Sequence, residues 1–400
     1  MPTAPPLPPL AGLTIVELGH SVAAPYAGLI LADLGARVIK VENPDKGDHA
    51  RGWGPPHWNG TAATFHCYNR GKEGIAIDLG DADEAAQLRR LIIDEADAVI
   101  QNLRAGVLSR YGLDGASLRA EKPGLIWCDI GAFGEGGPLA AKPGYDPLMQ
   151  ASTGIMSITG EHGRPPVRVG VSLVDMGAGM WTVIGLLSAL IARAGSGQGA
   201  HVQTSLYETG LAWMTAHLAG FAASGEVRRP YGSGVQEVVP YQAFETRQGW
   251  LMIAAGNDGL FRKLTAALGL AELASDPRFA TNSARILNRE AILSLIAEAV
   301  RTWPFGELQA ALDAAGVPNA PIQTVDQVAR HAQTEALGML QQSAAGELAL
   351  AGIALSIDGV RPRAKGSAPA LGEHNETVLG HSAKVKTSTK SKTSAKAKPR

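Results

Sequence analysis

The first forty residues alternate between strand and helix patterns, and this alternation constrains the fold more than any other feature. Thr14–Leu18 and Arg37–Glu42 are predicted to be buried strands. Between them, Tyr26–Leu34 is predicted to be a helix that ends at Gly35. Strands joined by a helix run parallel, because antiparallel neighbours need only a short turn. The fold class expected is therefore α/β, with an open parallel sheet.

The alternation continues along the chain. Further strands are predicted at Ile75–Leu79, Ala98–Asn102, Leu125–Ile130 and His201–Ser205, and helices at Asp83–Asp94, Val107–Tyr111, Met176–Arg193 and Tyr207–Ser224. A hairpin and three helices then predict a smaller α+β unit: Val239–Thr246, Trp250–Ala255, Leu260–Leu268, Arg289–Thr302 and Phe305–Ala315. We expect a large Rossmann-like domain over residues 1–224, a small domain over 225–330, a return to the large domain over 331–382, and a basic tail over 383–400.

The charge distribution argues against nucleic acid as a specific partner. Net charge is −1, but residues 383–400 carry seven basic side chains and no acidic one. Without them, 29 basic residues face 37 acidic ones, a net charge of −8. An acidic body does not bind a polyanion well. The Lys-, Ser-, Thr- and Ala-rich end is predicted to be a disordered solubilising tail.

The cysteines and apolar runs predict a cytoplasmic protein without a membrane anchor. Cys67 and Cys128 lie far apart, which suggests neither a disulfide framework nor a zinc site. The N-terminus lacks the basic and apolar regions of a signal peptide. No apolar run is expected to reach membrane-spanning length, because Gly185 and Ser188 interrupt Met180–Ala192.

The opening strand–helix–strand unit suggests a dinucleotide site with Glu42 as ribose ligand, but the turn Gly19–Pro25 lacks the pattern G-x-G-x-x-G. Asn69–Lys72, Asn102–Gly106 and Arg110 instead lie near strand ends, where amide and basic groups can bind phosphates. They favour a phosphate-bearing small molecule; the alternative is that they are merely solvated.

Asp175 follows an apolar segment and opens a helix whose first turn holds Gly177 and Gly179. It has no neighbouring Ser, Cys or His, so its chemistry would be that of a carboxylate attacking a carbonyl. The small residues would leave room for a thioester. Alternatively, Asp175 only caps the helix. His20 and Tyr145 also have structural alternatives: His20 is then a half-buried imidazole with its hydrogen bonds satisfied, and Tyr145 an aromatic ring packed in the core or at an interface.

Six segments carry a family resemblance: Leu34–Glu42, Asn69–Lys72, Asn102–Gly106, Gly144–Asp146, Val174–Met180 and Leu371–His374. In their order and spacing the chain resembles the class III, formyl-CoA transferase-like CoA-transferases, from Leu10 to about Leu379. The resemblance implies an open Rossmann-like lobe, a smaller lobe and two interlocked subunits in a homodimer. It also places Asp175 on the family's catalytic aspartate.

The resemblance further implies a set of substrate-binding residues. Those at CoA positions are His20, Ser21, Val22, Lys40, Asn43, Arg70, Asn102, Leu103 and Arg110, and those at acyl or acceptor positions are Tyr145, Arg168, Gly232 and Gly234. Some relatives have Gln in place of Val22 and Arg in place of Asn43. The glycine-run loop of formyl-CoA transferase is reduced here to Gly232–Gly234.

Tyr145 separates two reactions within the superfamily. Related racemases carry His there, and a tyrosine phenol, which ordinarily titrates near pH ~10, is a poor base at neutral pH. We therefore expect CoA transfer through an aspartyl anhydride and an aspartyl-CoA thioester, with racemase-like proton transfer or non-catalytic CoA binding as alternatives. Acyl-CoA is a substrate, and no permanently bound cofactor or metal is expected.

The acceptor expected is a C4–C6 dicarboxylate, with succinyl-CoA as donor. Pro166–Gly170 and Val239–Phe244 resemble the corresponding segments of relatives that act on dicarboxylates. Arg168 can pair with the distal carboxylate of such an acid. Its alternative role is a structural ion pair.

Overall fold

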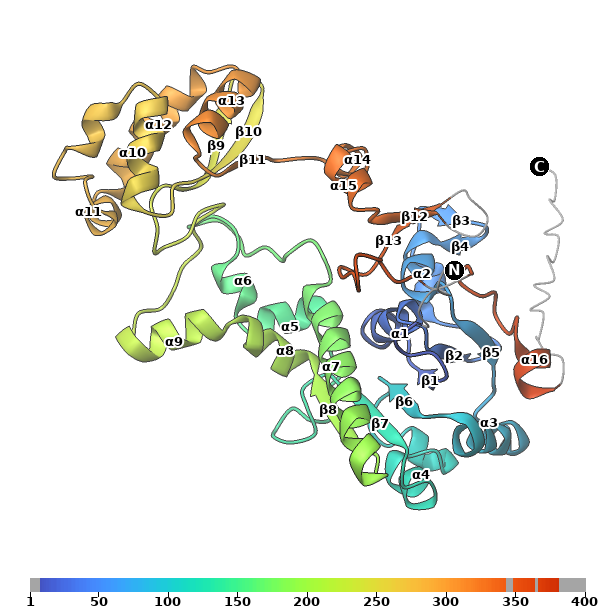
Figure 1. Ribbon diagram of the computed structural model, residues 1–400. Helices are drawn as coiled ribbons and strands as arrows, with labels where there is room; N and C mark the ends of the chain where they lie inside the picture. Colours follow the sequence, from blue (N-terminus) through green and yellow to red (C-terminus); the bar gives the residue numbers. More distant parts are fainter. Residues whose placement is uncertain (1–7, 343–347, 364–365, 381–400) are drawn as a thin grey trace, which may run out of the picture. The chain divides into compact units, whose positions relative to one another are not determined.

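The computed structural model describes residues 8–342, 348–363 and 366–380 of the 400-residue chain. These residues divide into two compact units (Figure 1). Unit 1 comprises the described residues of Met1–Met149, Val171–Trp213 and Leu337–Arg400, and unit 2 comprises Gln150–Gly170 and Met214–Ala336. Residues 150–170, 214–224 and 331–336, expected in the large domain, thus cluster with unit 2. The predicted tail, residues 383–400, lies outside the described residues.

Unit 1 is built on a six-stranded parallel sheet in the order β5-β2-β1-β6-β7-β8. Its strands are β1 (Thr14–Leu18), β2 (Arg37–Glu42), β5 (Glu73–Ala76), β6 (Ala98–Gln101), β7 (Ile126–Gly131) and β8 (His201–Ser205). The α/β class with a parallel sheet is therefore confirmed. The strand order reverses between β1 and β6, and ligands of open α/β sheets bind at such a switch point, beyond the carboxyl ends of the strands.

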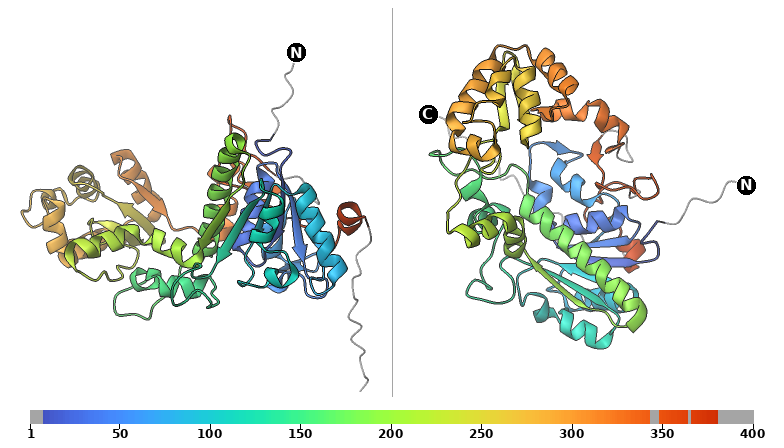
Figure 2. Two further views of the ribbon diagram at one scale, coloured as in Figure 1. Left: turned by 90° about the horizontal axis from the view of Figure 1, so that it is seen from below. Right: turned by 60° about the vertical axis from the view of Figure 1, so that its left-hand side comes forward.

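Helices cover both faces of this sheet (Figure 2). On one face, alternate strand residues such as Val16, Ile39 and Val99 form a core with apolar residues of α3 (Ala82–Glu95) and α4 (Gly115–Glu121). On the other face, α1 (Ala23–Asp33) and α7 (Leu173–Ser196) pack against each other and against the strands. This second face also carries buried charges, since Glu17 and Lys40 face each other across β1 and β2.

Shorter elements complete unit 1. They are η1 (His49–Gly52), β3 (His57–Trp58), β4 (Thr61–Ala62), α2 (Ala63–Asn69), η2 (Leu108–Tyr111), α8 (Leu206–Trp213), β12 (Leu340–Gln342), β13 (Ala349–Ala351) and α16 (Asn375–Leu379). Helix α5 (Asp146–Ser152) begins in unit 1 and ends in unit 2.

Unit 2 holds an antiparallel sheet, β11-β10-β9, with an apolar core of its own. Its elements are α6 (Ile155–Ile158), α9 (Thr215–Ser224), β9 (Tyr241–Thr246), β10 (Gly249–Ala254), α10 (Asp258–Ala267), η3 (Ala271–Ala274), α11 (Asn282–Leu287), α12 (Arg289–Arg301), α13 (Phe305–Ala315), β11 (Asn319–Pro321), α14 (Val325–Ala329) and α15 (Ala332–Ala336). The single helix predicted at Tyr207–Ser224 is wrong, because the chain breaks at Met214 into α8 and α9.

Helix α7 corrects a second expectation. Its 24 residues make it the one helix of the described chain long and apolar enough to cross a membrane, although no such run was expected. Gly185 and Ser188 do not interrupt it: a Cβ at Gly185 would touch Val202, and the Ser188 hydroxyl donates to Ile184 O. Of its most apolar 18-residue window, 44% is buried within the structure.

Two glycines allow α7 to approach its neighbours closely. A Cβ at Gly179 would lie 2.7 Å from Ala23 O in the first turn of α1. A Cβ at Gly177 would lie 2.7 Å from Thr209 Cγ2 in α8. The expectation that these small residues leave room for substrate is therefore wrong, because protein atoms fill that space.

We predict that Gly179→Ala lowers the free energy of unfolding by about 1–3 kcal/mol, because the methyl group overpacks the contact between α7 and α1. Urea-induced unfolding measures this change. The matched control is Gly195→Ala on the same helix, where a Cβ would meet no atom within 4 Å. That variant should gain up to about 1 kcal/mol from helix propensity. Equal effects at the two sites would contradict the close packing.

Candidate active site

The carboxylate of Asp146 binds the start of α7. Its Oδ2 atom accepts hydrogen bonds from the backbone N–H groups of Val174, at 2.8 Å, and Asp175, at 3.3 Å. Helix α7 begins two residues before Asp175, and the N-cap residue Ser172 makes no side-chain capping bond. The alternative that Asp175 only caps the helix is therefore wrong. A residue 29 positions earlier does the capping.

The Asp175 carboxylate is partly buried and forms no hydrogen bond with any other described residue. Burial, together with the nearby negative charge of Asp146, raises the pKa of Asp175 to about 7. An acid with this pKa is substantially ionised at neutral pH and is weakly solvated. Both properties suit a carboxylate nucleophile.

The first turns of α7 and α1 lie side by side, so Asp175 is near the beginning of α1. A Cβ at Gly179, one turn after Asp175, would come within 3.2 Å of Tyr26 Cδ1. The ring of Tyr26 meets that of Tyr68 edge-on, with centroids 6.1 Å apart. Burial is the largest cause that raises the pKa of Tyr68 to about 12, and neighbouring groups, among them Asp175 and Asp146, contribute to that value. In the sequence, Asp146 belongs to the matching segment Gly144–Asp146 but could not be assigned a role, and Tyr68 was not identified.

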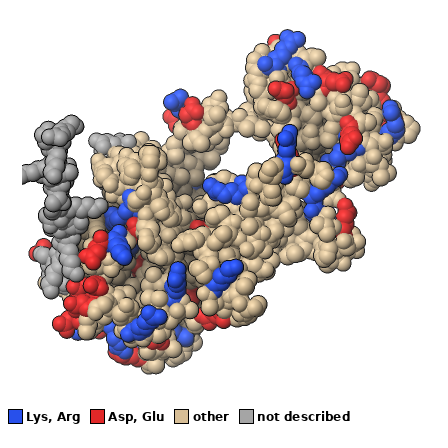
Figure 3. Space-filling view, turned by 180° about the vertical axis from the view of Figure 1, so that it is seen from behind, with Lys and Arg blue, Asp and Glu red and all other residues tan. Residues whose placement is uncertain are grey.

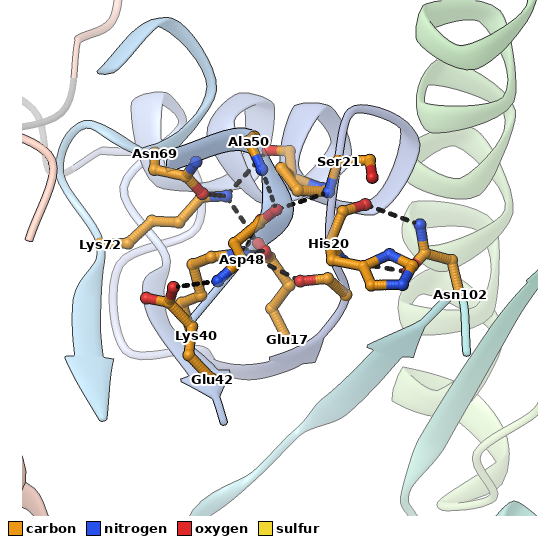
Figure 4. Close-up of polar contacts among 12 residues, drawn as sticks. Glu17, His20, Ser21, Lys40, Glu42, Asp48, Ala50, Asn69, Lys72 and Asn102 are labelled. Atoms are coloured by element: carbon orange, nitrogen blue, oxygen red, sulfur yellow. Dashed lines mark hydrogen bonds and ion pairs between the residues drawn. The ribbon is translucent and has the colours of Figure 1, made fainter. Parts of the chain in front are cut away.

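The turn after β1 meets the end of β6 at the switch point of the sheet (Figure 4). The side-chain amide of Asn102 binds both backbone groups of His20: Oδ1 accepts from His20 N at 3.0 Å, and Nδ2 donates to His20 O at 2.9 Å. Burial lowers the pKa of His20, which keeps its imidazole neutral at pH 7. Ser21 has a left-handed backbone with φ of 70°. His20, Ser21 and Asn102 are thus brought together.

Two basic residues predicted to contact CoA are buried. Lys40 is 0% exposed, and its Nζ contacts Glu17 Oε1 at 3.0 Å, Asp48 Oδ2 at 2.9 Å and Gly19 O at 2.8 Å. Burial opposes the charge of Lys40, but Glu17, Asp48 and Glu42 outweigh it and raise the pKa of Lys40. Arg70 is 6% exposed and pairs with Asp33.

The other predicted CoA residues differ in exposure. Val22 is buried as the residue before α1. Leu103 packs against the apolar core next to α3. Asn43 is exposed after β2, and its Oδ1 accepts from the N–H groups of Asp45 and Lys46. Arg110 is exposed in η2.

The predicted acyl and acceptor residues fall in both units. Tyr145 precedes α5 in unit 1 and is 61% exposed. In unit 2, exposed Arg168 donates only to the backbone carbonyls of Val169 and Gly170. Among the described residues Arg168 forms no ion pair, so its alternative role as a structural ion pair has no support within this chain. Gly232 and Gly234 lie in a turn in which Gly232 N donates to Gly160 O at 2.8 Å.

One group in the described chain has the donor set of a metal site. Potential ligand atoms of Asp129, Glu135 and His201 lie within 4.8 Å of one another. Both carboxylate oxygens of Asp129 already have protein partners: Oδ2 lies 2.6 Å from His201 Nε2, and Oδ1 accepts from Trp127 Nε1 at 2.7 Å. This group lies at β7 and β8 and has no part in the reaction proposed below.

A family model described as CoA-transferase family III matches residues 10–375. The chain belongs to this family. It is therefore an enzyme that transfers CoA, and its substrates include CoA thioesters. The alternatives of a racemase-like enzyme and of a non-catalytic CoA-binding protein are set aside.

Individual relatives of this CoA-transferase agree with the assignment. It is 37% identical to the succinate–glutarate CoA-transferase of Agrobacterium fabrum, over 93% of this chain and 95% of that one. It is 35% identical to the succinyl-CoA–D-citramalate CoA-transferase of Chloroflexus aurantiacus, over 93% of each chain. The crystal structure of a CaiB/BaiF family protein from Brucella suis matches 93% of this chain and 98% of that one, with 40% identity and a TM-score of 0.84.

The raised pKa of Asp175 predicts how stability depends on pH. The unfolded carboxyl ionises near pH 4 and the folded one near pH 7, so the folded state binds more protons in between and stability falls as pH rises through that range. Asp175→Asn cannot ionise, so it should be more stable than the unsubstituted CoA-transferase at pH 8, by up to about 4 kcal/mol, and similar to it at pH 4. Thermal unfolding across this range measures the difference.

The control for this prediction is Asp114→Asn. The pKa of Asp114 is lowered, chiefly by the backbone N–H of Ser117 at the start of α4. This substitution should therefore lose relative stability as pH rises toward about 4, where Asp114 ionises, and change little between pH 4 and 8, where Asp175→Asn gains. The same sign at both positions would contradict the assigned environment of Asp175.

Proposed function

We propose that this CoA-transferase moves CoA from succinyl-CoA to a C4–C6 dicarboxylate, with Asp175 as the covalent carrier. The observation that carries the assignment of Asp175 is the capping of α7 by Asp146. Because Asp146 satisfies N–H groups at the start of α7, the Asp175 carboxylate has no capping task. It is left ionisable near neutral pH, beside the turn where α1 begins.

The proposed reaction has two symmetric halves. A carboxylate oxygen of Asp175 attacks the thioester carbonyl of the donor, the C–S bond breaks, and an anhydride and the CoA thiolate result. The thiolate attacks the Asp175 acyl carbon, which forms an aspartyl-CoA thioester and expels the donor acid as its carboxylate. The acceptor carboxylate then attacks this thioester and releases the thiolate, which attacks the acceptor acyl carbon of the new anhydride. Asp175 returns to a carboxylate, and one thioester has replaced another without ATP.

The CoA site proposed is the turn Gly19–Val22 with its neighbours at the carboxyl ends of β2 and β6. Five predicted residues belong to it: His20, Ser21, Val22, Asn43 and Asn102. Backbone groups of a turn at a switch point suit the phosphates of a nucleotide. Arg110 is exposed and chemically suited to pair with a phosphate. Tyr145, Gly232 and Gly234 remain proposals for contacts near the acyl group.

The dicarboxylate acceptor is proposed from the relatives and from Arg168. Relatives named as acting with glutarate or D-citramalate are 35–37% identical to this chain. The Arg168 guanidinium contacts only backbone carbonyls of its own segment, at 3.1 and 3.4 Å, so it is available to a second carboxylate. A guanidinium can bind such a group through two parallel hydrogen bonds.

A homodimer is proposed because α7 presents a large apolar surface. Met180, Trp181, Ile184 and Ile191 are 45%, 43%, 50% and 78% exposed. Apolar residues that recur along one helix in this way indicate a protein interface. The interlocked arrangement expected from the family would cover such a surface with a second copy. Light scattering in solution checks this: the molar mass of a single chain, 41.6 kDa, would contradict the dimer.

We predict CoA exchange between succinyl-CoA and a panel of acids, fastest with a C4–C6 diacid. Chromatography of the acyl-CoA products measures the exchange. No exchange with any diacid, while a monocarboxylic acid is used well, would contradict the proposed acceptor class.

The same panel tests Arg168. Arg168→Ala should lower kcat/KM for diacids by roughly 10- to 100-fold, as expected for the loss of a charge-assisted pair. Monocarboxylic acids should change by less than about threefold. Arg164→Ala is the matched control, since Arg164 is also exposed in unit 2 and only approaches Glu161, at 3.9 Å. Equal losses for diacids and monocarboxylic acids would remove the role assigned to Arg168.

A further inference from the structure

The turn Gly19–Val22 is held from its buried side by charged side chains (Figure 4). Asp48, which is 3% exposed, contacts both the backbone of this turn and the neighbouring charged residues. Its Oδ1 atom accepts from the N–H groups of Ser21 and Ala50, both at 2.9 Å. Its Oδ2 atom lies 2.9 Å from Lys40 Nζ, and its own N–H donates to Glu42 Oε2 at 2.8 Å. Both oxygens of the Asp48 carboxylate therefore contact protein groups, and neither is directed at a ligand.

Ser21 explains why such a support is needed. Its φ of 70° lies in the left-handed region, which costs a residue with a Cβ roughly 1–2 kcal/mol. Backbone in rare conformations persists where surrounding contacts enforce it, and it gathers at ligand sites. The bond from Ser21 N to Asp48 Oδ1 enforces it here. On the far side, Asn102 fixes the preceding residue, His20, through both of its backbone groups.

The support is itself rigid because its charges are buried and paired. Glu17 lies between two lysines, 3.0 Å from Lys40 Nζ and 2.7 Å from Lys72 Nζ. Lys72 also donates to Pro25 O at 2.9 Å, in the first turn of α1. A Cβ at Gly28 would lie 2.0 Å from Glu17 Oε2, so α1 rests directly on this pair. Removing one partner would leave a buried charge uncompensated, which is strongly destabilising.

We propose that Asp48 is a positioning residue for CoA: by holding Ser21 in the left-handed conformation, it keeps the turn Gly19–Val22 shaped for acyl-CoA without touching the ligand. Lys40, predicted from the family resemblance to contact CoA, acts in the same way through Gly19 O and Asp48. A turn that is already ordered loses less conformational entropy when CoA binds, so its affinity is higher. The inference rests on the proposed CoA site at this turn.

The test is a double-mutant cycle between Asp48 and Ser21. Glycine adopts φ of 70° without the cost that serine bears, so it removes the need for the support. Asp48→Ala should weaken CoA binding about tenfold by calorimetry, on the order of the cost of one left-handed residue. In the Ser21→Gly background, the same substitution should weaken binding less than threefold. At saturating acyl-CoA, kcat should change little, because Asp175 is untouched.

Asp48→Asn keeps the inference testable if Asp48→Ala does not fold. Asparagine retains an oxygen for the N–H groups of Ser21 and Ala50 but loses the charge facing Lys40. Its CoA affinity should therefore fall less than that of Asp48→Ala, while its thermal stability falls. If Asp48→Asn is the only folded variant, its smaller loss should again shrink in the Ser21→Gly background.

Two outcomes would overturn the positioning role. One is unchanged CoA affinity in folded Asp48 variants. The other is an equal loss with and without Ser21→Gly, which would show a general effect of the buried charges. Failure of the proposed site looks different: Arg110→Ala, which removes an exposed guanidinium proposed to bind a CoA phosphate at the same site, would then also leave CoA affinity unchanged, whereas it weakens CoA binding if only the positioning role of Asp48 fails. The diacid exchange assay is independent of both results.

Discussion

The start of α7 is the point on which the proposed chemistry depends. Two of its N–H groups donate to Asp146, so the end of the helix is capped from another segment of the chain. Gly179 then lets the helix lie directly against the first turn of α1. Together these contacts bring a carboxylate that needs no partner of its own to the beginning of α1. The same Asp146 charge, added to burial, raises the pKa of Asp175 to about 7.

A second set of contacts shapes the turn that leads into the beginning of α1. The turn before it is fixed by Asn102 from β6 and by Asp48 from the loop after β2. Both supports lie just beyond the carboxyl ends of strands next to β1, because the sheet order places β2 and β6 on its two sides. The parallel sheet therefore determines which residues can reach the turn. In this account Asp175 supplies the reactivity, and the turn supplies the affinity for CoA.

The sequence was most informative where local pattern determines structure. β1, β2 and β8 lie at the predicted residues, because each is a short apolar or alternating run with clear ends. Asp146 could not be assigned a role, since its partners lie 28 and 29 residues away and are backbone groups. Lys40 was predicted to contact CoA because the family resemblance places it at a CoA position. Its place inside a strand of apolar residues was the sign of a buried charge, but the register that puts Glu17 opposite it is seen only in the structure.

The central claim is that Asp175 carries the acyl group and then CoA. The most direct measurement is mass spectrometry of the intact enzyme and its peptides after mixing with succinyl-CoA and rapid acid quenching. The account predicts an adduct of the donor acyl group or of CoA on the peptide that contains Asp175, and its loss in Asp175→Ala. An adduct on another residue, or undiminished exchange by Asp175→Ala, would contradict it.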